Sequence, residues 1–96
     1  MSGMQEIDHD ELVKKLMQLN YWKRIHENKL AYTLRESKPA RIVTGFSQII
    51  TYYDENNAYL CTLHRVIALD NSIVHEDIKD ACINQVRYIA VKKKFV

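Results

Sequence analysis

Glycine and proline are scarce in this sequence of 96 residues, which contains two glycines and one proline. Flexible linkers and low-complexity segments are rich in these residues, so both are excluded. Two glycines also cannot form the glycine-rich loop that holds nucleotide phosphates. No apolar run approaches the roughly 18 residues that a transmembrane helix needs. We therefore expect one small domain over residues 1–96, with no membrane association.

Cysteine is also rare, and Cys61 and Cys82 each lie in an apolar run. The N-terminal stretch MSGMQEIDHDE is acidic and lacks the apolar region of a secretory signal. Both cysteines are therefore expected to be reduced thiols in the core of a cytoplasmic protein. A zinc site made from these cysteines, His64 and His75 is disfavoured, because strand residues three apart point to opposite faces. We expect no metal and no other cofactor.

Positive charge is unevenly distributed, although the net charge is only +2. Residues 13–41 contain eight basic and two acidic residues, and residues 81–96 contain four basic residues and no acid. If these segments share one face of the fold, they form a footprint for an acidic partner such as nucleic acid. The residues assigned to this basic face are Lys14, Lys15, Lys23, Arg24, Lys92, Lys93 and Lys94. The alternative is that they only solvate helix surfaces and chain ends.

The apolar pattern predicts one helix followed by several strands. Leu12, Leu16 and Leu19 recur at helical spacing, so a helix is predicted from Asp8 to a point between Asn20 and Asn28. Alternating, β-branched and aromatic residues then predict strands. The predicted strands cover residues 30–37, 41–53 and 58–69, with a short addition at 72–75.

The C-terminal third admits two interpretations. Apolar residues recur at helical spacing from Val74 to Ala90, which predicts a C-terminal helix. The alternative takes Ile78–Ile83 and Val86–Val91 as two strands around Asn84-Gln85. We adopt the helix. The predicted fold class is therefore α+β, an antiparallel sheet of three to four strands with an N-terminal and a C-terminal helix (α-β-β-β-α).

This order of elements resembles that of double-stranded-RNA-binding domains in topology alone. Those domains carry a Ser-Lys-Lys start to their last helix, whereas the matching stretch here reads IVHEDIKDA and is acidic. No residue is therefore carried over from that family.

His64 and His75 are the candidate catalytic residues. Alternation along the third strand places His64 with Thr62 and Val66 on the face away from the helices. A hairpin around residues 70–71 brings His75 opposite Val66 on that same face. Two such imidazoles could perform acid–base chemistry on a phosphodiester, because imidazole titrates near neutral pH. The alternative is a solvated sheet residue and an unrelated helix-start residue, since no spacing here is diagnostic.

The outer face of the sheet is expected to be too apolar for full solvation. Leu60, Val66 and Ala68 are placed there, where a solvated face would show polar residues. Exposed apolar patches usually mark association, so this face is expected to be covered by the C-terminal segment or by a second copy of the chain, and we predict a homodimer or larger assembly.

Two functional hypotheses follow. The preferred one is a small non-enzymatic binding module of unknown specificity that self-associates and binds nucleic acid through the basic face. The alternative is a small ribonuclease-like enzyme of the toxin type that uses His64 and His75 as an acid–base pair. An interaction with another protein, as in an immunity or adaptor role, fits the composition equally well.

Overall fold

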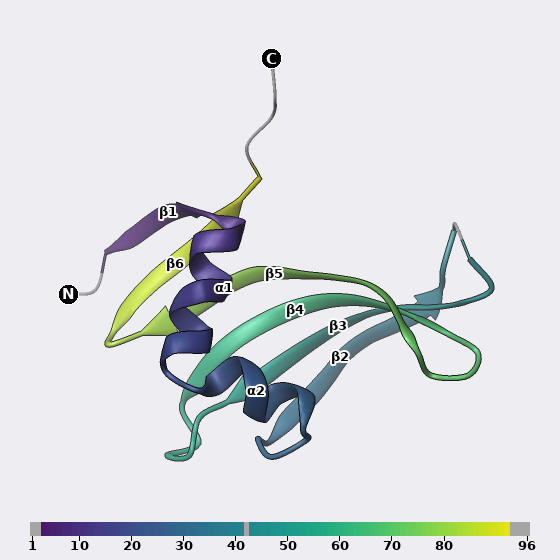
Figure 1. Cartoon of the computed structure of the whole chain (residues 1–96), viewed down its shortest axis with the longest axis horizontal. Coiled ribbons are helices and arrows are strands. Elements are labelled where there is room, and N and C mark those ends of the chain that lie inside the picture. The colour runs from purple at the N-terminus through teal and green to yellow at the C-terminus, as the bar shows by residue number, and fades with distance from the viewer. Residues whose placement is uncertain (1–2, 42, 93–96) are drawn as a thin grey trace.

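A computed structural model describes residues 3–41 and 43–92 and shows one curved sheet with two short helices (Figure 1). The sheet order is β1-β6-β5-β4-β3-β2, and only the β1–β6 pair is parallel. No helix in these two ranges is long and apolar enough to cross a membrane. The elements are β1 (Met4–Asp8), α1 (His9–Gln18), α2 (Tyr21–His26), β2 (Tyr32–Pro39), β3 (Gly45–Tyr53), β4 (Tyr59–Ala68), β5 (Ile73–Ile83) and β6 (Val86–Val91).

The predicted fold class is wrong. The sheet is mixed and has six strands, and β5 and β6 occupy the region expected to form a C-terminal helix. The arrangement follows the alternative of two strands joined at Asn84-Gln85. Both of these turn residues have positive φ, 51° and 68°, which suits a tight hairpin between antiparallel strands. The topological resemblance to double-stranded-RNA-binding domains disappears with the helix.

A bulge in β5 explains the misleading helical spacing. Leu63 pairs with Ile78 and Thr62 pairs with Asp80, so Lys79 is an extra residue on β5. Ile78 and Ala81 consequently both face the core, although they are three residues apart. A strand with one inserted residue thus shows a short stretch of spacing that is also typical of a helix.

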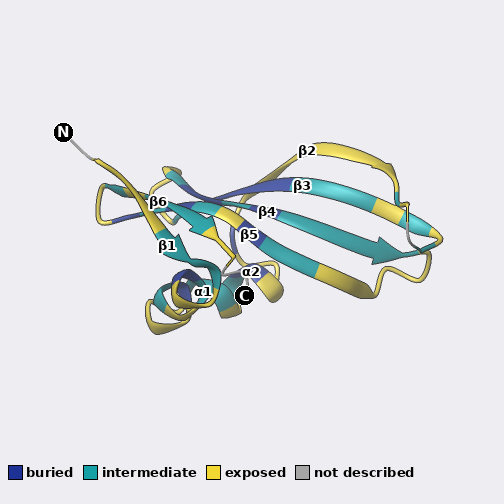
Figure 2. Cartoon of the chain, turned by 90° about the horizontal axis from the view of Figure 1, so that it is seen from above, coloured by how far each residue is buried: buried dark blue, intermediate teal, exposed yellow. Residues whose placement is uncertain are grey.

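The N-terminal helix is confirmed, with two features that its pattern did not reveal. The helix begins at His9, immediately after β1 adds a parallel strand to the edge of the sheet. It is then interrupted near Asn20, whose φ of 64° is left-handed, before α2 begins at Tyr21. This break turns α2 so that both helices pack on one face of the sheet (Figure 2).

The core lies between that face and the two helices. Leu12 and Leu16 of α1 and Ile25 of α2 are buried against residues of the central strands. The strand residues in this core include Ile50, Tyr52, Leu60, Cys61, Leu63, Ile78, Ala81 and Ile83. Leu60 was expected on the outer face, but it is buried in the core.

The cysteines are both free, but only Cys61 is buried, whereas Cys82, which was also expected in the core, is half-buried. Cys61 belongs to the hydrophobic core, where burial raises the pKa of its thiol to about 12. A thiol with so high a pKa stays protonated near neutral pH and is a poor nucleophile and metal ligand.

An ion network joins α2 to the sheet on the helix side. Glu76 of β5 accepts hydrogen bonds from Arg65 Nε and His26 Nε2, both at 2.6 Å. His26 Nδ1 lies 2.8 Å from the carbonyl oxygen of Trp22. Both ring nitrogens therefore face acceptors, which only the doubly protonated imidazolium can satisfy. The hydrogen bond to Glu76 is the main cause of the raised pKa of His26, and burial opposes it.

The network predicts a pH-dependent stability. Because the pKa of His26 in the folded protein is above its ordinary value of 6.5, the His26–Glu76 pair contributes fully below pH 6.5. That contribution is lost as the pH rises through the raised pKa. Urea unfolding from about pH 5.5 to about pH 8.5 should show wild-type stability falling relative to His26→Gln. Parallel curves for the two proteins would contradict this assignment.

Truncation of a core side chain tests the packing of α1. Leu16 is fully buried, whereas its neighbour Met17 is 57% exposed. We expect Leu16→Ala to lower the free energy of unfolding by about 2–5 kcal/mol, because the lost transfer energy and the cavity add. Met17→Ala is the matched control, and we expect it to change stability by less than about 0.5 kcal/mol. Equal effects in denaturant titrations would show that α1 does not pack as described.

Candidate active site

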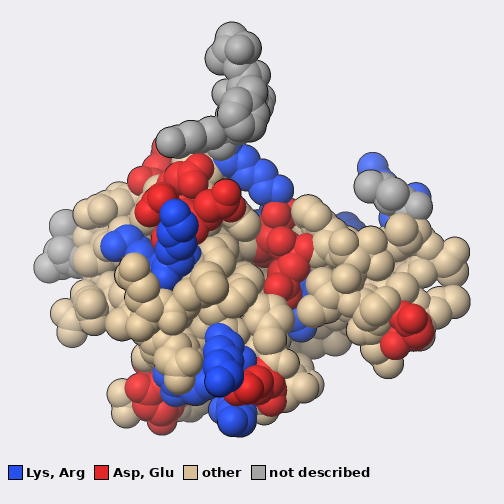
Figure 3. All heavy atoms as spheres, viewed as in Figure 1, with Lys and Arg blue, Asp and Glu red and all other residues tan. Residues whose placement is uncertain are grey.

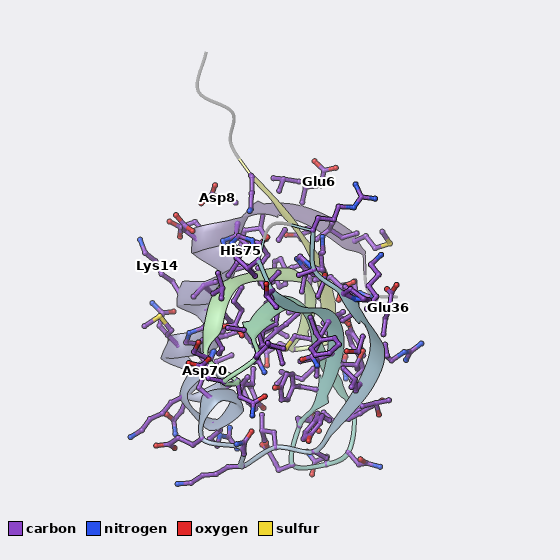
Figure 4. The ribbon with its side chains drawn as sticks, turned by 90° about the vertical axis from the view of Figure 1, so that its right-hand side faces the viewer. Glu6, Asp8, Lys14, Glu36, Asp70 and His75 are labelled. Atoms are coloured by element: carbon purple, nitrogen blue, oxygen red, sulfur yellow. The ribbon has the colours of Figure 1, made fainter. Side chains whose placement is uncertain are left out.

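One end of the sheet extends beyond the helices (Figure 2). The residues at this end line a pocket. Its volume is about 550 Å³, which lies in the range of small-ligand sites. Figure 4 looks onto this end of the molecule, with His75 and Asp70 on the β5 side and Glu36 on the β2 side. The lining residues come from β2, β3, β4, β5 and the β2–β3 connection: Lys38, Pro39, Ala40, Arg41, Val43, Ser47, His64, Val66, Val74 and His75.

The register between β4 and β5 brings the two predicted histidines together. His64 pairs with Asp77, and Val66 pairs with His75, as the hairpin argument predicted. These three polar side chains therefore share one face, opposite to that of buried Leu63. The ring centroids of His64 and His75 lie 6.1 Å apart, with an edge-to-face tilt of 63°.

His64 is held by a hydroxyl from the neighbouring strand. Its Nε2 lies 2.8 Å from Ser47 Oγ, and both residues are partly buried. Burial lowers the pKa of His64, and the positive charge of Lys79 lowers it further. The imidazole is therefore mainly neutral at pH 7, which leaves it able to accept a proton.

His75 is more exposed and carries a carboxylate partner. Its Nε2 lies 2.7 Å from Asp77 Oδ2, while Asp77 Oδ1 lies 2.7 Å from Lys92 Nζ. Burial opposes ionisation of Asp77, but the hydrogen bonds from Lys92 and His75 outweigh it and lower the pKa of this carboxyl. Asp77 is consequently ionised at neutral pH and places a negative charge directly beside the His75 ring.

His9 forms a hydrogen bond with the backbone of β5 next to Asp77. Its Nε2 accepts the backbone N–H of Ile78, at 3.1 Å, on the part of β5 that β6 does not cover. Because Nε2 acts as an acceptor, Nδ1 carries the proton, and it lies 3.1 Å from Asp10 Oδ1. His9 therefore occupies an otherwise unpaired backbone amide at the start of α1, which helps to hold the helix beside Asp77.

Among the described residues of the predicted basic face, the basic side chains on the helix side lie next to acidic ones (Figure 3). Lys14 pairs with Glu11, Arg24 with Glu55 and Lys92 with Asp77. Lys15 lies over the ring of Tyr88 and Lys23 is exposed on α2. Lys93 and Lys94 lie outside the described residues. The basic groups that do line the pocket are Lys38 and Arg41, at the end of β2 and in the connection after it.

Sequence reasoning found the two histidines but missed the groups around them. Ser47 could have been found, since its position opposite Val66 in the β3–β4 hairpin places it on the His64 face. Asp77 was assigned to a helix and therefore not to this face. Lys38 and Arg41 reach the pocket through the path of the β2–β3 connection, which the strand pattern does not specify.

No protein-family model matches the chain, and no curated protein or solved structure is significantly similar to it. The geometry of the pocket is therefore the basis for any functional assignment.

Proposed function

We propose that this pocket binds single-stranded RNA and that His64 and His75 cleave its phosphodiester bond as an acid–base pair. The main support for this proposal is that the ring centroids of His64 and His75 lie 6.1 Å apart and that both residues line a pocket of about 550 Å³. A base and an acid must both reach the same scissile group, and this separation lets two imidazoles flank one phosphate. Two cationic residues line the pocket and supply the electrostatic attraction for that phosphate: Arg41, and Lys38, which also contacts Glu36 at 3.4 Å.

The environments of the two rings assign their roles. Neutral His64 accepts the proton of the ribose 2′-hydroxyl, whose oxygen then attacks phosphorus. His75, which lies beside the Asp77 carboxylate, acts as the acid and donates a proton to the departing 5′-oxygen. Lys38 and Arg41 stabilise the negative charge that increases on the phosphoryl oxygens. The products are a 2′,3′-cyclic phosphate and a free 5′-hydroxyl, so no metal or external reductant is required.

RNA is favoured over DNA because this mechanism uses the 2′-hydroxyl as nucleophile. An RNA substrate is also consistent with a cytoplasmic location, which we propose because both cysteines are free. The preferred hypothesis from sequence, a non-enzymatic nucleic-acid-binding module, shares the ligand but not the chemistry. Binding through the basic residues of the helices has less support, because none of them lines the pocket that contains both histidines.

Self-association remains a separate proposal and has different support. Every residue of the edge strand β2 is exposed, including Tyr32 at 59% and Leu34 at 48%. An exposed edge offers unpaired backbone groups to another strand, and apolar side chains on it add burial. We propose that two copies of the chain pair through β2.

Replacement of either pocket histidine tests the cleavage proposal. We expect His64→Ala and His75→Ala each to reduce cleavage of a short RNA by about 10²–10⁴-fold, the usual contribution of a positioned acid or base. The wild-type rate should be bell-shaped in pH, with its acidic limb below pH 6.5 because the pKa of His64 is lowered. Mass spectrometry should identify a 2′,3′-cyclic phosphate.

The matched control is His26→Gln, which removes a histidine from the helix side of the sheet. It should cleave RNA at the wild-type rate, and all three variants should keep the wild-type circular dichroism spectrum. An oligonucleotide with 2′-deoxyribose at the scissile position should bind and stay intact. RNA binding without cleavage would favour the non-enzymatic module, and absence of RNA binding would contradict both.

A charge on β2 tests self-association. Light scattering of the wild type should give a mass above the 11.3 kDa of one chain. Leu34→Lys should shift the protein to a monomer, because a lysine directly on the edge opposes strand pairing. Met17→Lys, on the exposed surface of α1, should leave the mass unchanged. A wild-type monomer at micromolar concentration would end this proposal.

A further inference from the structure

Three potential ligand groups for a metal ion converge at the pocket. Donor atoms of His64, His75 and Asp77 lie within 4.8 Å of one another. A tetrahedral zinc ion with bonds of about 2.0–2.2 Å holds neighbouring ligand atoms about 3.4 Å apart. Small side-chain rotations would therefore bring these three donors to coordination distance.

The backbone fixes the three residues on rigid neighbouring strands. His64 pairs directly with Asp77, and His75 stands two residues along the same face. The register is uninterrupted between these positions, because the two irregularities of the β4–β5 pair lie outside them, at Thr62/Leu63 and at Val66/Ile67. A site built on paired strands keeps its donor spacing better than one built on a loop.

Neighbouring groups orient two of the donors. Ser47 Oγ lies at 2.8 Å from His64 Nε2 and fixes the orientation of that ring. Lys92 holds Asp77 Oδ1, which leaves Oδ2, the oxygen nearest His75, for a metal. The Ser47 contact is of the kind that orients ligands in protein metal sites, whereas the positive charge of Lys92 opposes a bound cation.

We propose that His64, His75 and Asp77 bind a zinc ion in a site with three protein ligands and a fourth position open to the pocket. Two imidazoles and one carboxylate form the donor set that suits zinc, and three protein ligands are typical of an accessible zinc site. The pocket side of the ion would carry water or an anionic ligand. The zinc site that the sequence analysis disfavoured combined these histidines with Cys61 and Cys82, and Cys61 lies in the core instead.

Metal binding and RNA cleavage by this pocket exclude each other. Both use the imidazole nitrogens of His64 and His75, and a coordinated nitrogen cannot transfer a proton. Zinc is therefore expected to inhibit the proposed cleavage. The metal site itself does not rest on the cleavage proposal, because its donors and their spacing are independent of any substrate.

Cobalt(II) is the probe for this site, because tetrahedral Co²⁺ absorbs visible light strongly. Titration of the metal-free full chain should give saturating absorption at one ion per chain, which equimolar Zn²⁺ then removes. His64→Ala, His75→Ala and Asp77→Asn should each abolish it, whereas His26→Gln should retain it. Lys92→Gln should tighten binding several-fold, because it removes a cation that competes for Asp77.

The outcomes separate the two proposals. Absence of visible absorption, or absorption that survives loss of His64 or His75, would overturn the metal site. RNA cleavage is measured in parallel with EDTA and with added Zn²⁺. Cleavage in EDTA without cobalt binding would leave only the acid–base proposal, and cobalt binding without cleavage would leave only the metal site. Cleavage in EDTA that Zn²⁺ suppresses would support both.

Discussion

The pairing of β4 with β5 is the interaction on which both the core and the candidate site depend. A strand has a side-chain period of two, so a shift of one residue would exchange its two faces. In the observed register, Leu63 and Ile78 meet in the core, while His64 and Asp77 meet on the opposite face. The burial of two apolar residues therefore fixes the position of two polar neighbours, and the site inherits its geometry from the hydrophobic core.

Two bulges in β5 lie on either side of the segment that pairs with His64–Val66, and they also affect the shape of the sheet. Each inserts one residue into β5 and increases the local twist. The outer part of the sheet extends beyond the two helices (Figure 2). Lys79 at one bulge lies close enough to lower the pKa of His64. The distortion that bends the sheet thus also places a positive charge near the proposed base. Without the bulge, Lys79 would pair with a residue of β4 instead of being the extra residue between Ile78 and Asp80.

Much of the local structure follows from the sequence, and the errors have a definite physical origin. Strands β3 and β4, the first helix and the placement of His75 opposite Val66 could be predicted from alternation and turn residues. The C-terminal helix could not be rejected, because the bulged β5 mimics helical spacing and because Gln85 rarely adopts positive φ. The parallel pairing of β1 with β6 joins the two ends of the chain, and no local pattern encodes such a long-range contact.

Asp77 connects the proposed chemistry to the sheet edge. One carboxylate oxygen contacts His75 in the pocket, and the other contacts Lys92 just after β6. His9 lies 3.8 Å from that second oxygen and also binds the backbone of Ile78. The Asp77 carboxylate therefore contacts the Lys92 ammonium group at the sheet edge and the His75 imidazole in the pocket. Loss of the Lys92 contact would leave more negative charge for the pocket, which favours a bound cation over an anionic phosphate. We therefore expect the charge at the end of β6 to influence which of the two proposed ligands the histidines prefer.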